Sequence, residues 1–300
     1  TPSLRALRVA APTPLQGATP EARQSRFLGV SRKKRVQGET LRADQLLVER
    51  GLAVSRSQAV RLIASGVRWQ DGATWRQVAK NKDDIPADAP LQLQDDAEAR
   101  YVSRGGLKLE GALRATGLDV SGQWCLDVGQ STGGFTDCLL RHGATRVVGI
   151  DVGQAQLHPR MREDARVLCV EGVNARALDA IEFIAECQDW SGAGGNFDGY
   201  FSTLVADVSF ISLTLVLPAV VPLLAPGGHL LVLVKPQFEL QPGQVGKGGI
   251  VRDEALYAVV ERRLRDCCAA LGLEVQAWFD SPIDGGDGNR EFFLAARRGP

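Results

Sequence analysis

Two lysines and two acids stand where a hydroxyl substrate could meet a cofactor: Lys108, Asp207, Lys235 and Glu291. Asp207 directly follows the apolar stretch 200–206, and Lys235 follows the apolar stretch 229–234. If both stretches are parallel strands, their carboxyl ends place these two side chains on the same rim of a sheet. Each residue taken singly is more often a surface charge or part of an ion pair. Together, cations and acids beside a poorly acidic hydroxyl would assist the loss of its proton.

A glycine-rich turn marks the expected cofactor site. Residues 126–137 (LDVGQSTGGFTD) combine the end of a buried strand, a turn and the start of a helix. A dinucleotide fingerprint needs glycines that let the backbone touch a pyrophosphate, but here Ser131 replaces the second glycine and Asp127 would repel phosphates. Asp151, after the apolar stretch 146–150, could accept both hydroxyls of a ribose. A cationic cofactor without phosphate, S-adenosylmethionine, therefore fits better than a dinucleotide.

The turn also admits a purely structural interpretation, in which Gly133 and Gly134 only permit tight packing of strand on helix. That interpretation leaves the flanking acids unexplained. We therefore expect cofactor contacts from the turn and from the acids at the neighbouring strand ends, which are Asp127, Gly129, Ser131, Thr132, Gly133, Gly134, Phe135, Asp151 and Asp207.

Length, charge and cysteine usage bound the class of protein. The 300 residues allow about two domains, and 35 basic residues balance 35 acidic ones, so any nucleic-acid surface must be local. The six cysteines show no metal-ligand spacing, which predicts reduced thiols of a cytoplasmic protein and no metal site. No apolar run reaches the roughly 18 residues of a membrane-spanning helix. We therefore expect no membrane contact.

Residues 98–300 alternate apolar strands with helices. Near-continuous apolar runs such as 230–234 (LLVLV) indicate strands that helices bury on both faces. The last two strands are joined by a short loop, so one of them should be antiparallel. This pattern predicts an α/β fold with a doubly wound, Rossmann-like sheet of the class I methyltransferase kind and helices on both faces. The expected strands are 124–128, 146–150, 165–169, 200–206, 229–234, 274–279 and 291–296, the last opened by Glu291.

The first 97 residues divide into a tail and a compact unit. Residues 1–38 are rich in Pro, Ala and Arg and contain the cluster 32–35 (RKKR). This composition predicts a basic disordered tail, which either binds RNA phosphates weakly or is a solvated extension. Residues 39–97 show leucines at helical spacing over two short helices, followed by short extended pieces. They predict a small α+β unit.

The helix pair of this small unit carries a family resemblance. Segments 42–51 (RADQLLVERG) and 55–66 (SRSQAVRLIASG) resemble an S4 RNA-binding domain, in which this pair presents basic residues to structured RNA. Arg56, Arg61 and Arg68 bracket the second helix. On charge alone, a solvated helix face is an equal alternative. The resemblance implies that the three arginines bind RNA.

Further motifs resemble the TlyA, or hemolysin-A-type, ribosomal RNA 2′-O-methyltransferases, in which an S4 domain precedes an FtsJ-like methyltransferase domain. The motifs occupy residues 101–109, 127–137, 149–158, 206–213, 234–239 and 288–293. The resemblance implies the following parts: an S4-like domain at 39–97, a linker at 98–103 and a methyltransferase domain at 104–300.

The resemblance also implies roles. The family's Lys-Asp-Lys-Glu tetrad falls on the two lysines and two acids named above, and Arg104 is an implied RNA contact. Asn174 is an implied cofactor contact, although its segment 171–176 (EGVNAR) departs from the family pattern. The segment near Arg100 and Tyr101 would be a hinge. The implied activity is methyl transfer from S-adenosylmethionine to the ribose 2′-hydroxyl of a cytidine, with ribosomal RNA or ribosomal subunits as partners.

Gln130 is another departure, because it is larger than the small residue expected in the turn; a side chain directed to solvent would accommodate it. Two other classes of function stay open. One is a noncatalytic RNA-binding or ribosome-assembly factor that keeps the fold, which the intact tetrad disfavours. The other is a cytolysin, which the family's name suggests and which the lack of a signal peptide or spanning segment disfavours.

Overall fold

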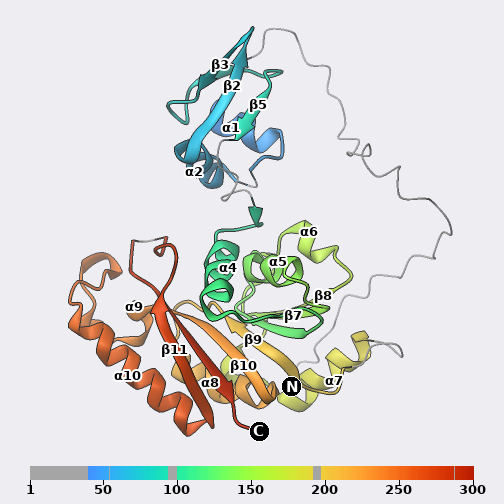
Figure 1. The fold of residues 1–300 in the computed structure, drawn as a ribbon, viewed down its shortest axis with the longest axis vertical. Helices are drawn as coiled ribbons and strands as arrows, with labels where there is room; N and C mark the ends of the chain where they lie inside the picture. The colour runs from blue at the N-terminus through green and yellow to red at the C-terminus, as the bar shows by residue number, and fades with distance from the viewer. Residues whose placement is uncertain (1–39, 54, 94–99, 192–196, 287) are drawn as a thin grey trace, which may run out of the picture. The chain divides into compact units, whose positions relative to one another are not determined.

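The protein is described by a computed structural model, shown in Figure 1. The description covers residues 40–53, 55–93, 100–191, 197–286 and 288–300. The expected basic tail and the first residues of the expected linker lie outside these ranges. The chain falls into two compact units that divide between Leu93 and Gln94. Each unit is described by itself.

The smaller unit packs two helices beside short antiparallel strands. Its elements are β1 (Thr40–Arg42), α1 (Ala43–Glu49), α2 (Arg56–Gly66), β2 (Val67–Asp71), β3 (Thr74–Gln77), β4 (Asp84–Pro86) and β5 (Leu91–Leu93). After α1, Gly51 adopts a φ of 69°, which glycine does readily. Helix α2 begins where Ser55 Oγ accepts a hydrogen bond from the Gln58 N–H. The expected helix pair is confirmed, and Leu47 and Leu62 are among its fully buried side chains.

The larger unit is built on one seven-stranded sheet in the order β11-β12-β10-β9-β6-β7-β8. Its strands are β6 (Trp124–Val128), β7 (Arg146–Asp151), β8 (Val167–Glu171), β9 (Phe201–Ala206), β10 (Leu224–Val234), β11 (Leu273–Asp280) and β12 (Phe292–Arg298). Strands β6 to β10 pair in parallel, and β12 is antiparallel to both β10 and β11. The expected doubly wound sheet with an antiparallel strand near its end is confirmed.

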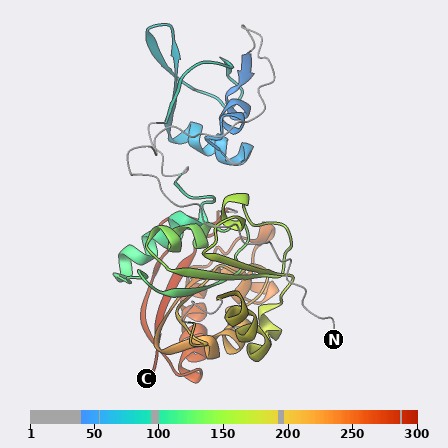
Figure 2. The ribbon, with the colours of Figure 1, turned by 90° about the vertical axis from the view of Figure 1, so that its right-hand side faces the viewer.

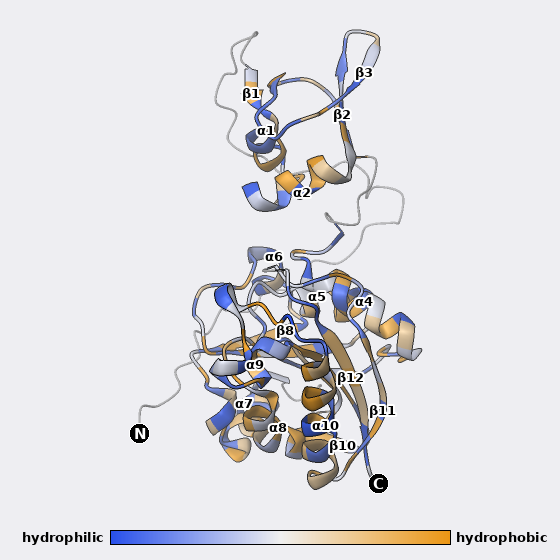
Figure 3. Ribbon diagram, turned by 90° about the vertical axis from the view of Figure 1, so that its left-hand side faces the viewer, coloured by the Kyte–Doolittle hydropathy of each residue, from blue (hydrophilic) through white to orange (hydrophobic). Residues whose placement is uncertain are grey.

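Helices cover both faces of this sheet, as Figures 1 and 2 show. One hydrophobic cluster joins the sheet to α4 (Gly105–Thr116), α5 (Gly134–Arg141) and α6 (Pro159–Arg162). A second cluster joins the opposite face to α7 (Ala180–Ser191), α8 (Leu213–Val220) and α10 (Ala255–Ala270). Short helical pieces lie in the loops: α9 (Pro236–Glu239), η2 (Ala175–Ala177), η3 (Val221–Leu223), η4 (Pro242–Gln244) and η5 (Lys247–Gly249). Figure 3 shows the hydrophobic segments concentrated along the strands and the inner helices.

Three expected strand positions need correction. The strand expected at 229–234 is β10, which starts five residues earlier, at Leu224. The strand expected at 165–169 is β8, which starts later, at Val167, because the turn before it ends with the Val167 N–H donating to Asp164 O. Glu291 does not open the last strand but immediately precedes it, since β12 begins at Phe292. Within the described residues, no helix combines the length and the apolar character that crossing a bilayer requires.

Candidate active site

The carboxyl ends of the parallel strands meet at one edge of the large sheet. Register alignment pairs Val128 of β6 with Ala206 of β9, and Ala206 in turn with Val232 of β10. Across the antiparallel pair, Val234 lies opposite Phe292. The residue that follows β9, the residue that follows β10 and the residue that precedes β12 are therefore near neighbours. These are the expected residues Asp207, Lys235 and Glu291.

The expected tetrad assembles as two ion pairs. Lys235 Nζ lies 2.6 Å from Asp207 Oδ1, and both side chains are partly exposed. Lys108, on α4, donates to Glu291 Oε2, and these two side chains keep only 9% and 3% of their exposure. The structure therefore brings all four residues together as one buried pair and one partly exposed pair.

The charges of the two pairs act on each other. Burial raises the pKa of Glu291, against the opposing effect of Lys108 and Lys235, while the negative charge of Asp207 raises it further. An acid whose proton affinity is increased in this way is common at catalytic sites and also occurs in structural ion pairs. Here the acid touches a lysine, and it lies at the edge of the sheet that holds the glycine turn.

An aromatic pair lies beside Lys235. Besides Asp207, Lys235 Nζ also donates to Ser209 Oγ at 2.8 Å. The next residue, Phe210, has a φ of 63°, unusual for a bulky side chain, and is 90% exposed. Its ring centroid lies 4.9 Å from that of Phe238 in α9. The sequence did not point to these residues individually, although Ser209 and Phe210 lie within the motif at 206–213.

The turn between β6 and α5 is shaped by glycines that face other backbone segments. Gly129 and Gly133 have φ values of 83° and 89°. A side chain at Gly129 would meet the carbonyl of Asp207, and one at Gly134 would meet Ser103. The absence of side chains at Gly129 and Gly134 lets the end of β9 and the start of α4 approach the turn.

A cavity of about 80 Å³ lies over this turn. Its lining combines expected residues (Gly129, Ser131, Thr132, Gly134, Phe135 and Asp207) with three that were not expected (Ser103, Gly105 and Gln130). Ser103 precedes α4 and Gly105 is the first residue of that helix, and packing of α4 against α5 brings both to the turn. The cavity therefore borders the accessible pair of the tetrad through Asp207.

The other expected cofactor residues do not line the cavity. Asp151 holds the turn, because its carboxylate oxygens accept from the backbone N–H groups of Ser131 at 2.6 Å and Gly153 at 2.7 Å. Gly133 faces Leu157 and Met161. Asn174 is exposed after β8, where its Oδ1 accepts from the Arg176 N–H and caps η2.

Asp127 lies beneath the turn and is fully buried. Burial raises the pKa of Asp127 to about 7, and the charges of Asp207 and Asp151 contribute to the rise. The interpretation of Gln130 as a residue directed to solvent is wrong. Only 4% of Gln130 is exposed, because its amide packs over Gly149 in β7, where a glycine leaves room, and donates to Thr136 Oγ1 at 2.9 Å.

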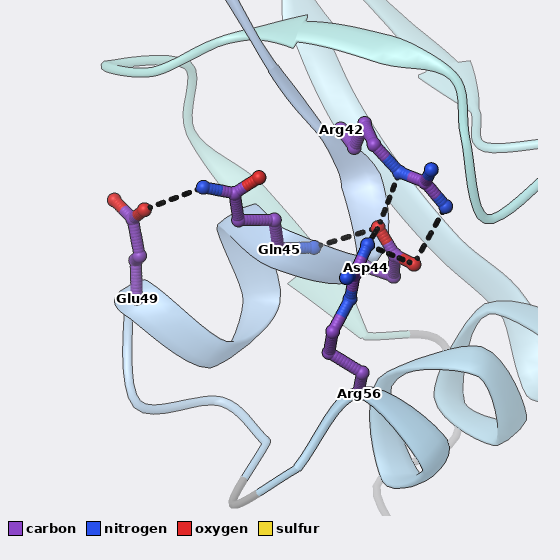
Figure 4. Close-up of polar contacts among 5 residues, drawn as sticks. All are labelled: Arg42, Asp44, Gln45, Glu49 and Arg56. Atoms are coloured by element: carbon purple, nitrogen blue, oxygen red, sulfur yellow. Dashed lines mark hydrogen bonds and ion pairs between the residues drawn. The ribbon is translucent and has the colours of Figure 1, made fainter.

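In the smaller unit, two arginines converge on one buried acid, as Figure 4 shows. Asp44, 3% exposed, accepts from Arg42 Nε and Nη2 at 3.1 and 3.0 Å and from Arg56 Nη2 at 3.2 Å. The two arginine side chains remain 44% and 60% exposed. Although burial alone would raise the pKa of Asp44, the two arginines lower it. Arg56 is thus a partly exposed cation held in place by an acid that the sequence search did not identify.

The other expected RNA contacts have more local surroundings. Arg61 Nη1 donates to the Ser57 carbonyl within α2, and Arg68 Nη2 donates to the Trp75 carbonyl across the β2–β3 pair. In the larger unit, the half-buried Arg104 precedes α4.

Comparison with known proteins gives consistent matches. A model of the FtsJ-like methyltransferase family matches residues 101–298. The 16S/23S rRNA (cytidine-2′-O)-methyltransferase TlyA of Mycobacterium tuberculosis is 43% identical over 85% of this chain and 89% of its own. Hemolysin A of Brachyspira hyodysenteriae is 36% identical over 84% of this chain and 98% of its own. A solved structure of a protein from Streptococcus thermophilus that carries a hemolysin name is 37% identical, covers 87% of this chain and 89% of its own, and has a TM-score of 0.64.

The family match spans the whole of the large sheet and both of its helical layers. It also includes the glycine turn and all four members of the tetrad. On this combined evidence, the chain belongs to the FtsJ-like methyltransferase family.

Proposed function

We propose that this protein transfers a methyl group from S-adenosylmethionine to the ribose 2′-hydroxyl of a cytidine in ribosomal RNA. The observation that carries the proposal is the pairing of Lys235 with Asp207 at 2.6 Å on the border of the cofactor cavity. The Mycobacterium tuberculosis relative that is 43% identical to this chain is named a 16S/23S rRNA (cytidine-2′-O)-methyltransferase. Because the proposed substrate is ribosomal RNA, free or in ribosomal subunits, the proposed site of action is the cytoplasm.

The charges around the cavity fit S-adenosylmethionine. Asp127, Asp151 and Asp207 surround the turn, which suits a cation and disfavours phosphates. When bound, S-adenosylmethionine supplies a methyl group on a positively charged sulfur. The backbone of the turn, fixed by Asp151 through Ser131, would hold the methionine part, and Asn174 and Asp151 would lie toward the nucleoside part.

The tetrad would handle the substrate hydroxyl. Lys235 Nζ is held by Asp207 and Ser209. The remaining hydrogen-bonding position on the nitrogen can engage a hydroxyl placed at the cavity. We assign Lys235, once its ammonium has released a proton to solvent, the uptake of the hydroxyl proton, and Asp207 the stabilisation of the ammonium that this uptake restores. The buried pair, Lys108 and Glu291, would keep α4 and β12 in register with this site and balance its charge.

Two surfaces support a nucleotide substrate. The exposed ring of Phe210, braced by Phe238 next to Lys235, offers a face on which the base of a nucleotide can stack. In the smaller unit, Arg56, Arg61 and Arg68 are the proposed contacts to RNA phosphates, and Arg104 is a further one in the larger unit. Arginine suits this task because its planar group donates several hydrogen bonds to phosphate.

Two other functions make different predictions. A noncatalytic RNA-binding or assembly factor would bind ribosomal RNA without transferring methyl groups, and the complete tetrad speaks against it. A cytolysin, suggested only by the hemolysin names of some relatives, would lyse cells as a purified protein.

The test is transfer of labelled methyl from S-adenosylmethionine to separated ribosomal subunits and to transfer RNA, followed by mapping of 2′-O-methyl sites. Lys235→Ala should lower the rate about 10²–10⁴-fold, the range typical of a lost acid–base group, while cofactor affinity stays within a few-fold. Lys247→Ala, which removes an exposed lysine, is the matched control and should retain activity. Absence of label in every RNA despite cofactor binding would contradict the proposal, and label confined to transfer RNA would contradict the substrate.

A further inference from the structure

A short chain of hydrogen bonds holds one oxygen of the Asp127 carboxyl group. Gln130 Nε2 donates to Thr136 Oγ1 at 2.9 Å, and Thr136 Oγ1 donates to Asp127 Oδ2 at 2.6 Å. The other carboxyl oxygen of Asp127, Oδ1, and the amide oxygen of Gln130 are buried and have no hydrogen-bond partner among the described residues. The chain therefore fixes one side of the carboxyl group and leaves the other side without a partner.

The titratable groups that face Asp127 are acids or thiols. Burial, together with Asp207 after β9 and Asp151 at the end of β7, raises the pKa of Asp127 to about 7. Cys125, in the same strand, and Cys169, in β8, have thiol pKa values of about 12, so both are neutral near pH 7. From α5, the facing group is the hydroxyl of Thr136, whose hydrogen bond lowers the pKa. Lys235 lies in this group as well, but its ammonium is engaged by Asp207.

These surroundings respond to a positive charge placed in the cavity. Gly129 and Gln130, which line the cavity, are the second and third residues after Asp127 in the chain. Asp127 is also linked to the cavity in space, because Gln130 reaches it through Thr136 and the charge of the lining residue Asp207 acts on it. A cation bound in the cavity therefore favours the ionised carboxylate. A neutral ligand of the same shape has no comparable effect.

We propose that Asp127, positioned by Thr136 and Gln130, distinguishes the cationic sulfonium of the cofactor from the uncharged thioether of its by-product by releasing its proton when the sulfonium binds. This inference rests on the proposed function, because it takes S-adenosylmethionine as the methyl donor. It assigns Asp127 a role in selectivity and makes Thr136 and Gln130 positioning residues.

The proton balance of this cycle closes without another reactant. When the cofactor binds, the O–H bond of the Asp127 carboxylic acid breaks, its electron pair stays on the carboxylate and the proton passes to solvent. Once the methyl group has left, the sulfur is neutral, so the carboxylate takes up a proton from solvent. The by-product then loses its electrostatic attraction to Asp127, and its release is favoured.

The coupling predicts a dependence of affinity on pH. With a pKa of about 7 in the free protein, affinity for S-adenosylmethionine should rise about tenfold between pH 6 and pH 8, because protonated Asp127 must first lose its proton. Affinity for S-adenosylhomocysteine, the neutral by-product, should change much less over the same range.

The experiment is isothermal titration calorimetry of the full chain at pH 7 in two buffers of different ionisation enthalpy, with S-adenosylmethionine and S-adenosylhomocysteine as ligands. The difference in heat gives the number of protons released. We expect about half a proton for the cation, since about half of Asp127 is protonated at its pKa, and clearly less for the neutral ligand. Asp127→Asn should abolish the difference between the two ligands.

Thr136 provides the second, independent test. Its hydrogen bond lowers the pKa of Asp127, so Thr136→Val should move the midpoint of proton release to higher pH, and Thr136→Ser, which keeps the hydroxyl, should restore it. A residue that only supported the fold would not give this pair of results. Equal proton release with both ligands, or release that persists in Asp127→Asn, would overturn the inference. Failure of the proposed function would instead show as absent methyl transfer by the unmodified protein.

Discussion

Asp44 and Asp127 are buried to a similar degree, at 3% and 0% exposure, and yet the pKa of Asp44 is lowered and that of Asp127 is raised to about 7. Asp44 lies in the small unit between Arg42 and Arg56, whereas Asp127 lies in the large unit beside Asp207 and Asp151. Burial raises the proton affinity of both, and the sign of the neighbouring charges decides the outcome. Two arginines satisfy the first acid, and we propose that the bound cofactor supplies a cation to the second.

Glu291 stands between these two cases. Its pKa is raised although Lys108 contacts it, because burial outweighs the attraction of the lysine. A contact with a cation is therefore not sufficient to keep a deeply buried acid at its ordinary pKa. The three acids form a series against which substitutions can be compared.

The largest effect should come from breaking the buried pair of the tetrad. Glu291→Gln leaves the Lys108 ammonium buried without a countercharge and should lower the free energy of unfolding by about 3–5 kcal/mol. Urea unfolding at pH 7 measures it. The double variant Lys108→Met with Glu291→Gln removes both charges and should recover part of the loss. A loss below about 1 kcal/mol would mean that the pair is better solvated than its burial indicates.

Asp127→Asn should have the opposite effect and raise the free energy of unfolding. The folded pKa of Asp127 lies above its unfolded value, so native stability is lost as pH rises from about 4 to about 7, and asparagine removes this penalty. The stabilisation by Asp127→Asn should be roughly 2–3 kcal/mol larger at pH 8 than at pH 5, at about 1.4 kcal/mol per pKa unit. Urea unfolding at the two pH values measures it. Asp189→Asn, at an exposed acid, is the control; a pH-independent effect at Asp127 would contradict the comparison.

Asp44→Asn should give the smallest effect and should destabilise the protein. The folded pKa of Asp44 is lowered, so its contribution is present at neutral pH and is lost as pH falls through the folded value. Because both arginine partners are half exposed, we expect a loss of about 1–3 kcal/mol at pH 7, which shrinks in acid. Thermal unfolding of the small unit, followed at several pH values, measures this loss of stability. Asp88→Asn, at an exposed acid, is the control. A stabilising effect would show that Asp44 resembles Asp127 after all.

Much of the fold followed from local patterns. Apolar runs such as 230–234 located the buried strands, and the short connection between the last two strands indicated an antiparallel partner. Strand ends were less accurate, as at β8, because hydrogen bonds in the preceding turn fix where a strand starts. The tetrad was predictable because each member lies next to a strand or helix that the sequence reveals, and the register of the sheet brings such ends together.

The sequence by itself determined which residue types meet at the edge of the sheet: two lysines, several acids and a glycine turn. Only the tertiary structure decided how deeply each of these charged groups is buried and which groups it contacts. The burial of Gln130 depends on the space over Gly149 in another strand, and the role of Ser103 depends on packing of α4 against α5. Contacts of this kind join segments distant in sequence, so no local pattern encodes them. Electrostatic environment is set by these contacts, and for that reason the pKa of Asp127 could be read only from the folded chain.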